Sequence, residues 1–216
     1  MVQTANPVIT HDGNGIGSRL KRSIRRLSPS MRWLVRFLPT GSSRDSFLSS
    51  IKALAKAVGV EARNPKWTSY GALELDIFCP TAADLETFLA ASKPIAKAEF
   101  VTDLSRAPEH LTDDEVLSKA KRLFNAERYW ECHEVLEGLW RQKEGDEKRL
   151  LQGVILVCAA YVHHQKGEDG VALGVLGRGA ILLDSTLEKY HALDVSRLRD
   201  QVRRALEAGT LAGFRL

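Results

Sequence analysis

The sequence predicts an α+β protein in which a small βαββαβ domain is followed by an all-α antiparallel helical bundle. Two observations in the 216 residues lead to this prediction. Between about residues 31 and 103, apolar side chains recur by turns at strand spacing and at helical spacing. From residue 109 onward the spacing is helical throughout, and only short polar breaks interrupt it. Because the two patterns occupy separate stretches of chain, we expect two domains.

The first half contains six elements in the order strand, helix, strand, strand, helix, strand. The segment MRWLVRFL places apolar side chains on one side and two arginines on the other, which indicates a strand. A helical stripe follows and is closed by Gly59. The segment NPKWTSYG is expected to turn the chain between the second and third strands. The six elements are predicted at residues 31–38, 44–58, 60–63, 72–79, from Pro80 onward, and 95–104. This order is the split-βαβ, ferredoxin-like arrangement.

The second half is predicted to contain five helices. The first begins at the capping box formed by Thr112 and Glu115. The third is apolar nearly all round, so we expect it to lie at the centre of the bundle. Short breaks between the helices favour antiparallel neighbours. The later four helices are predicted at about residues 128–143, 147–164, 169–190 and 195–208.

Positive charge is concentrated near the start of the chain. The net charge is +4, and residues 1–38 carry seven basic residues against one acidic residue. We expect residues 1–29 to be a disordered basic arm, residues 30–104 the α+β domain and residues 109–216 the all-α domain. The arm is either a solvated tail or a segment that binds nucleic acid or an anionic membrane. The candidate nucleic-acid contacts are Arg19, Lys21, Arg22, Arg25 and Arg26.

Composition and cysteine usage exclude several classes of protein. No apolar run approaches the roughly 20 residues that span a bilayer, and the first residues do not have the pattern of a secretory signal. The three cysteines are isolated, so neither a disulfide framework, a zinc ribbon nor an iron–sulfur cluster is indicated. A reducing compartment follows, and we predict a cytoplasmic protein.

The segment YWECHEVLEGLW, residues 129–140, concentrates the polar side chains of interest on one helix. At about 100° per residue, His133 falls inside an apolar stripe with Tyr129, Leu136 and Trp140. Glu137 lies at the edge of this stripe, one turn from His133, so that the two side chains can touch. Trp130 and Glu134 lie at the same edge. The edge of the stripe is therefore where a site would open.

The third helix is expected to place two further polar side chains near this segment. If residues 144–146 form a tight hairpin, Gln152 lies opposite Glu137. His163 then lies roughly 9 Å along the helix axis from His133, from the rise of about 1.5 Å per residue. Direct chelation of one ion by both imidazoles is therefore strained.

Three segments in this order resemble the domain of unknown function family 309. They are LFNAERYWECHEVLEGLWR, LLQGVILVCAAYVHH and GVALGVLGRGAILL, and the resemblance covers about residues 112–185. It implies a small all-α domain of bacteria and archaea without an assigned activity. Val157 and Cys132 depart from the family, which often has Gln and Ala there. The family's recurring polar positions correspond to Glu131, His133, Glu134, Glu137, Gln152 and His163.

Three interpretations of these polar residues are open. His133 and Glu137 can form a buried hydrogen-bonded network with Gln152, without a ligand. They can instead bind a small ligand or a divalent metal ion, with His133, Glu137 and His163 as candidate metal ligands. Catalysis is the third, although HExxE lacks the second His of the zincin motif HExxH. The candidate ligand-binding residues are Trp130, Glu131, His133, Glu134, Glu137, Trp140, Gln152 and His163.

The preferred functional prediction is a non-enzymatic module that binds a small ligand or an ion. The helical domain would hold the ligand beside His133 and Glu137, and the α+β domain would mediate assembly, for example as a homo-oligomer through an edge strand. Two alternatives are kept. One is a metal-assisted hydrolase at the same residues, and the other is a nucleic-acid-associated protein that uses the basic arm.

Overall fold

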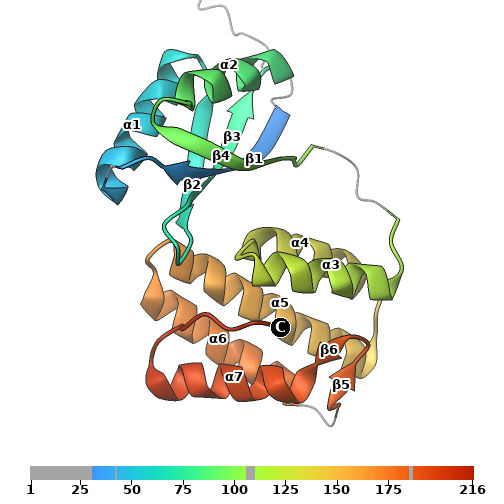
Figure 1. Cartoon of the computed structure of the whole chain (residues 1–216). Helices are drawn as coiled ribbons and strands as arrows, with labels where there is room; N and C mark the ends of the chain where they lie inside the picture. The colour runs from blue at the N-terminus through green and yellow to red at the C-terminus, as the bar shows by residue number, and fades with distance from the viewer. Residues whose placement is uncertain (1–30, 42, 106–109, 185–186) are drawn as a thin grey trace, which may run out of the picture.

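The structure is a computed structural model that describes residues 31–41, 43–105, 110–184 and 187–216. The predicted basic arm, with its five candidate nucleic-acid contacts, lies outside these ranges. Figure 1 shows the described chain as two halves, with a sheet and two helices above and a helical bundle below. None of the helices in the described ranges has the length and apolar character that crossing a membrane requires.

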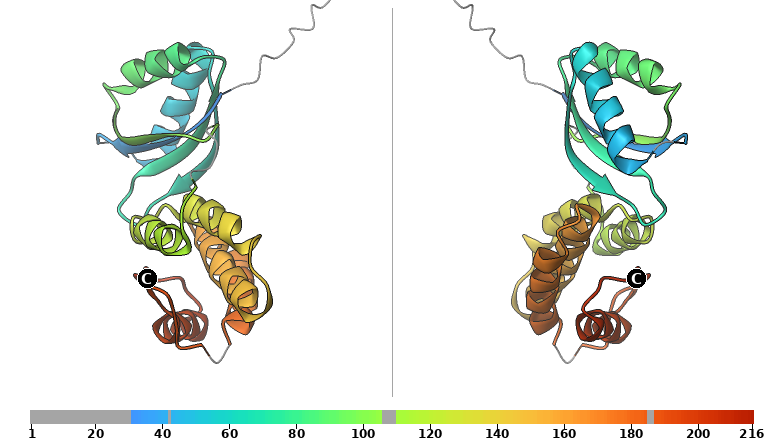
Figure 2. Two further views of the ribbon diagram at one scale, coloured as in Figure 1. Left: turned by 90° about the vertical axis from the view of Figure 1, so that its right-hand side faces the viewer. Right: turned by 90° about the vertical axis from the view of Figure 1, so that its left-hand side faces the viewer.

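The upper, α+β half has the predicted element order. Its strands form one antiparallel sheet in the order β2-β3-β1-β4, so the first strand is central. Both helices pack on the same face of this sheet (Figure 2). Its elements are β1 (Met31–Pro39), α1 (Arg44–Ala57), β2 (Glu61–Trp67), β3 (Leu73–Cys79), α2 (Ala82–Ser92) and β4 (Ala96–Asp103).

β2 is longer than predicted, because the strand continues past a bulge. Residues 64–67, which the sequence assigned to a turn, lie in the strand. The pairing of β2 with β3 shifts register between Arg63 and Lys66. Asn64 has a φ of 51°, which Asn tolerates better than most residues, and its side chain donates a hydrogen bond to Asp76. The bulge therefore replaces the expected end of the strand.

The two faces of the sheet differ in chemistry. One face is apolar and forms a core with α1 and α2, to which Val35, Phe37 and Leu75 contribute. The other face carries charged side chains that are nevertheless buried, namely Arg36, Lys66, Glu74 and Asp76. Buried charges need partners, so this second face must be covered and paired.

The lower, helical half contains five helices, as predicted, and a short hairpin. α5 packs against both α4 and α6 and is buried along most of its length, which confirms its central position. The capping box at Thr112 and Glu115 is present at the start of α3. The elements are α3 (Asp113–Asn125), α4 (Tyr129–Trp140), α5 (Gly145–Gln165), α6 (Asp169–Leu183), β5 (Lys189–Tyr190), β6 (Leu193–Asp194) and α7 (Val195–Ala208).

The predicted fourth helix, residues 169–190, was too long. α6 ends at Leu183, and Tyr190 lies in β5 instead. His191 has a φ of 51° and turns the chain between β5 and β6, while the Asp194 side chain accepts a hydrogen bond from the Arg197 amide and caps α7. Tyr190 packs into the bundle core, so its apolar character does not come from a helical stripe.

The helical half covers the charged face of the sheet. Figure 2 shows the hairpin between β2 and β3 extending down to the helices, and Figure 1 places its tip at the end of α5. Arg36 of β1 donates to the carbonyl oxygens of Ala126 and Glu127, at 2.7 and 2.8 Å, in the turn that follows α3. The covering therefore supplies part of the pairing that the buried charges require.

Candidate functional site

On the polar face of α4, the side chains of His133 and Glu137 lie close together, as the helix geometry predicts. His133 Nε2 lies 3.8 Å from Glu137 Oε1, and Arg141 donates to Glu137 at 2.8 Å. His133 Nδ1 lies 3.5 Å from a carboxylate oxygen of Glu134, but it is buried and makes no hydrogen bond within the described residues. The His133 side chain is 24% exposed. His133 is thus reachable from solvent and is not enclosed by the apolar stripe.

The other predicted site residues do not converge on His133. Gln152 is exposed on α5, and no hydrogen bond joins it to Glu137 within the described residues. His163 Nδ1 is 2.5 Å from Glu168 at the other end of α5. Glu131 binds Arg128. The expected network through Gln152 is therefore absent, because the rotation of α5 about its axis turns this residue to solvent.

A divalent metal ion does not fit this arrangement. In the described ranges, no group of three or more His, Cys, Asp and Glu side chains is placed to hold one. His133 and Glu137 supply two donors, and Arg141 already binds the carboxylate of Glu137. Protein zinc sites use three or four ligands. No metal-dependent step follows from these residues.

Both tryptophans of the motif have partners. The ring of Trp130 faces the sheet, where Arg32 and Lys66 lie 4.7 and 5.6 Å from its centroid. Trp140 lies at the far end of α4, where Lys148 is 4.7 Å from its ring. Trp130 thus joins the two halves through cation–π contacts.

The charged sheet face (Arg32, Arg36, Lys66, Glu74 and Asp76) is an ion-pair network that sequence analysis missed. Glu74 lies directly across from Arg36 on β1 and from Lys66 on β2, at 3.0 and 2.9 Å. Asp76 binds Arg32 at 2.7 Å and Asn64 at 2.9 Å. Because side chains alternate between the two faces along β3, Glu74 and Asp76 lie on the face that points away from the apolar core. Their burial depends on the helical half, which no local pattern reveals.

Glu127 connects four segments at the turn between α3 and α4. Its carbonyl oxygen accepts hydrogen bonds from Arg36 and from Gln165 of α5, at 2.8 and 2.9 Å. Its carboxylate accepts from the Ser69 amide at 2.7 Å and from the Ser69 hydroxyl at 2.5 Å, in the β2–β3 hairpin. Glu127 has a φ of 55°, a left-handed conformation that is unfavourable for a non-glycine residue. We call this set of contacts the Glu127 joint.

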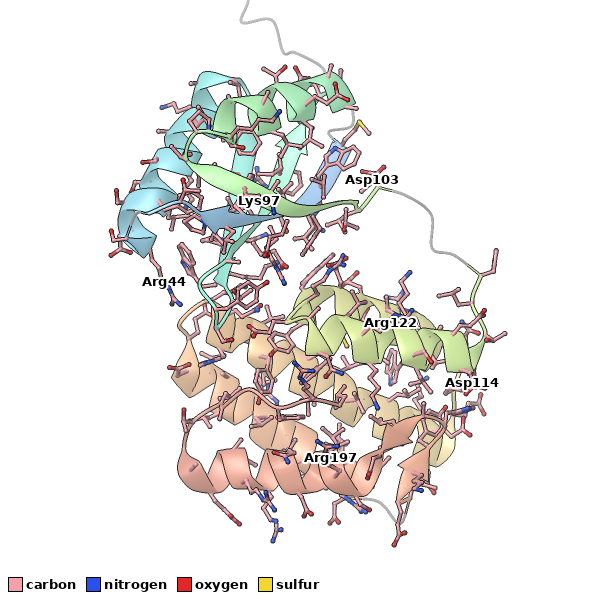
Figure 3. The ribbon with its side chains drawn as sticks, viewed as in Figure 1. Arg44, Lys97, Asp103, Asp114, Arg122 and Arg197 are labelled. Carbon is pink, nitrogen blue, oxygen red and sulfur yellow. The ribbon has the colours of Figure 1, made fainter. Side chains whose placement is uncertain are left out.

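A pocket of about 380 Å³ lies beside the Glu127 joint. Both halves line it, through the start of α1, the β2–β3 hairpin, the α3–α4 turn, the end of α5, the start of α6 and the C-terminal segment. We call it the inter-half pocket. In Figure 3 Arg44 extends from the start of α1 toward the helical half. Its lining includes Arg44, Trp67, Tyr129, Tyr161, Gln165 and Lys166.

The inter-half pocket has a buried polar atom without a partner. Gln165 is only 5% exposed, and its Nε2 donates to the Glu127 carbonyl. Its Oε1 is buried and has no hydrogen-bond partner within the described residues. Most buried polar side-chain atoms in folded proteins are hydrogen-bonded, so a free acceptor beside a pocket marks a place where a donor can bind.

The aromatic walls of the pocket are neutral. Tyr129 and Tyr161 lie with ring centroids 4.8 Å apart. Burial raises the pKa of Tyr129 well above its usual value, and the nearby Glu127 carboxylate adds to this effect. Burial likewise raises the pKa of Tyr161. Both phenols therefore keep their protons at neutral pH, and the Tyr161 hydroxyl donates to the carbonyl of Ala212 at 2.7 Å.

Only one pocket residue, Tyr129, belongs to the segment that sequence analysis singled out. Gln165 directly follows the histidine pair of α5, and Trp67 lay in a predicted turn. The α+β side of the pocket precedes the helical side by some tens of residues, and no periodicity links the two. Each side of the pocket includes a run of turn-forming residues, SYG in the α+β half and KGED in the helical half. Because binding residues are often carried by loops, these two runs were a usable signal for the pocket.

One of the comparisons with known proteins concerns residues of the helical half. Residues 117–175 match the family model DUF309, whose description is a domain of unknown function. No curated protein matches the chain. A conserved hypothetical protein from Thermus thermophilus, known from a crystal structure, is 37% identical. That match covers 45% of this chain and 99% of the Thermus chain, with a TM-score of 0.38. The residues of the family match include α4 and α5, which carry the motif of the predicted resemblance. The helical half of the chain therefore belongs to the DUF309 family.

Proposed function

We propose that the protein is a binding module for a small ligand, and that the ligand occupies the inter-half pocket. The observation that carries the proposal is Gln165, which lines a pocket of about 380 Å³ and whose buried Oε1 has no partner within the described residues. Ligand pockets in proteins are typically about 300–1,000 Å³, with mostly aromatic and apolar walls and a few placed polar groups. The pocket has this size, and its lining combines three aromatic residues with a larger share of polar groups.

The position of the pocket suggests a regulatory role. Ser69 and Trp67 come from the α+β half, and Tyr129 and Gln165 come from the helical half. A ligand that contacts both halves stabilises the arrangement in which they touch, by an amount set by its concentration and affinity. The α+β half thus contributes one wall of the site, in addition to the role in assembly that the sequence suggested.

The polar face of α4 is the other place where a ligand can bind, as the sequence predicted. His133 and Glu137 lie close together there, and His133 is accessible. The inter-half pocket is preferred because it has a volume of about 380 Å³, aromatic residues in its lining and a buried glutamine with a free acceptor. The two sites share no residue of their polar lining, so one experiment can separate them.

Nuclear magnetic resonance of the ¹⁵N-labelled full chain tests the proposal with two neutral aromatic N–H donors, indole and benzamide. We expect shifts at the Gln165 side-chain amide and at the backbone amides of Gly167 and Gly213. The variant Gln165→Met should weaken binding about three- to tenfold, because one hydrogen bond is worth about 0.5–1.5 kcal/mol. Melting temperatures verify that this variant is folded.

The matched control is Gln152→Met, which changes the exposed glutamine of the predicted motif site. It should leave the affinity for both probes unchanged. Shifts confined to His133, Glu137 and Gln152 would move the site to α4. The absence of any saturable shift in the pocket would contradict the proposal.

A further inference from the structure

The acidic groups of the inter-half pocket are already bound by the protein. Both carboxylate oxygens of Glu127 accept hydrogen bonds from Ser69. Asp169 lies 2.6 Å from Nδ1 of His164, which also lines the pocket. A carboxylate with such partners is less available to a cationic ligand, because binding would first have to displace them. The acceptor capacity of these two acids is therefore already partly used within the protein.

The basic groups of the same pocket form no salt bridge. Within the described ranges neither Arg44 nor Lys166 lies within 4 Å of a carboxylate oxygen, and the Glu168 carboxylate, which is bound by His163, interacts with Lys166 only at longer range. The Arg44 guanidinium lies 5.2 Å from the centroid of Trp67, and its one hydrogen bond, to the Thr68 carbonyl, is long at 3.5 Å. A guanidinium has five N–H donors and an ammonium three, so most of these donors remain free.

Helix dipoles do not change this balance. The C-terminal end of α5, which is negative, and the N-terminal end of α6, which is positive, both lie at the pocket through Gln165 and Asp169. Their partial charges are similar in size and offset one another. The side chains therefore decide, and the charged groups with free hydrogen-bonding capacity are the donors of Arg44 and Lys166.

The remaining lining selects a ring and a hydrogen-bond donor. Trp67 and the edges of the buried Tyr129 and Tyr161 lie at the pocket, and Gln165, which lines it, carries the buried acceptor Oε1. Resting on the proposed function, we infer that the ligand is a small aromatic anion, with a carboxylate or phosphate held by Arg44 and Lys166 and an N–H or O–H group held by Gln165. The ring and the donor lie at the aromatic walls, and the anionic group lies at the two exposed cations.

Two pairs of probes measure the contribution of the negative charge. The first pair is indole-3-propionate and its neutral amide, and the second is phenyl phosphate and phenol. Titrated into the full chain at low salt, each anion should bind roughly tenfold more tightly than its neutral partner, because charge-assisted hydrogen bonds are about twice as strong as neutral ones. The two pairs separate a preference for carboxylate from a preference for phosphate.

Variants assign this preference to residues. Arg44→Gln and Lys166→Gln should each reduce the ratio of anion to neutral affinity about threefold, and the double variant should abolish it. Lys52→Gln, an exposed lysine of α1 outside the pocket, should leave the ratio unchanged. Both target side chains are exposed, so the variants should fold, and the wild-type ratio is informative without them.

The outcomes separate this inference from the proposed function. Equal affinity for anion and amide, or a preference that survives in the double variant, would overturn the assignment of an anionic ligand. The pocket itself would then still be supported by the shifts that indole produces. If indole, benzamide and all four charged and neutral probes fail to shift the pocket amides, both proposals are wrong.

Discussion

Arg36 is a buried residue through which the two halves make contact. It binds Glu74 on the neighbouring strand and donates to the carbonyls of Ala126 and Glu127 in the helical half. Its guanidinium also lies 4.8 Å from the centroid of Phe100. Arg36 is only 2% exposed. In a variant without the guanidinium, water therefore cannot readily replace it as the hydrogen-bond donor to these buried partners.

The variant Arg36→Met should lower the free energy of unfolding by about 3–5 kcal/mol, since it leaves Glu74 buried with Lys66 as its remaining cationic partner. Urea denaturation followed by circular dichroism measures the change. Arg63→Met is the matched control, because its pair with Glu61 is exposed and its other contact is with the Phe78 ring at 4.9 Å, so that the loss should stay below about 1 kcal/mol. Equal losses in the two variants would contradict the role assigned to Arg36.

Three buried tyrosines are expected to ionise only at high pH. Burial raises the pKa of Tyr129 and Tyr161, and raises the pKa of Tyr190 to about 12. The unfolded chain ionises near pH 10. Stability from these groups is therefore complete below pH 10 and is lost as the pH rises above it, because only the unfolded state releases protons there.

Absorbance at 295 nm should accordingly show little tyrosinate at pH 10 in the folded protein. Further ionisation should appear together with the loss of far-ultraviolet circular dichroism. A titration with a midpoint near pH 10 for these three tyrosines, in protein that is still folded, would contradict their burial.

Among the candidate site residues, the sequence could predict only contacts within one helix. His133 and Glu137 lie together because a spacing of four residues fixes their positions on α4. Gln152 is not their neighbour, since its direction depends on how α5 rotates against α4. The pairing of Glu74 with Arg36 and Lys66 depends on strand register, which the sequence pattern alone did not supply.

Among the elements, α5 and α6 make an unusually close contact through glycines. A Cβ atom built on Gly179 would lie 3.2 Å from the Gly153 carbonyl oxygen and 3.3 Å from Leu156 Cβ. A Cβ built on Gly153 would meet Leu183 at 2.9 Å. The Gly- and Ala-rich segment of the motif therefore allows the two helices to approach each other closely.

Gly179→Ala should destabilise the protein by about 1–3 kcal/mol, because the added methyl forces α6 away from α5. Gly174→Ala on the same helix meets nothing within 4 Å and should stabilise by about 0.5–1 kcal/mol, from helix propensity alone. Thermal unfolding of both variants checks the opposite signs. The same sign for both would mean that the close packing is not important.

The types and the order of the main elements could be predicted from the periodicity of apolar residues. The residues at which the elements end were predicted less accurately. The first strand and α7 begin where the sequence indicated. The end of β2 was missed because a bulge at Asn64 allows the strand to continue through a stretch with turn-forming residues. The end of α6 was missed because Tyr190 and Leu193 are apolar at positions that also fit a helix, although they pack from a hairpin.

At the scale of the whole molecule, two hydrophobic cores are joined by a polar contact. One core lies between the sheet and α1 and α2, and the other lies around α5. Trp130, Arg36 and Glu127 connect them across the charged sheet face. Independent folding of the two predicted domains stays a prediction, but the contact between them should couple their unfolding.

Calorimetry tests this coupling. The wild-type chain should unfold in one transition, and Trp130→Ala should separate it into two, because the variant removes the ring that Arg32 and Lys66 contact. Trp140→Ala is the control, since its ring contacts Lys148 within the helical half. It should lower the melting temperature without dividing the transition. Two transitions in the wild type, or one in Trp130→Ala, would contradict the prediction.

The inter-half pocket could not be predicted from either half alone. Its lining combines Arg44 and Trp67 with Tyr129 and Gln165, and the two groups meet only because the helical half covers the sheet. That covering in turn depends on the buried ion pairs of the charged sheet face. The site is thus a property of the assembled chain, whereas the motif on α4 is a property of one helix.

A contact made of charges has a consequence for motion. Two halves that were held by an apolar seam would expose hydrocarbon surface on parting, and water would drive them back together. Arg36, Lys66, Glu74 and Asp76 would instead be hydrated at once, so the open form carries a much smaller penalty in solvation. Parting of the halves at this seam would therefore cost less in solvation than at an apolar one, and dissolved salt would favour the parted form by screening its exposed charges.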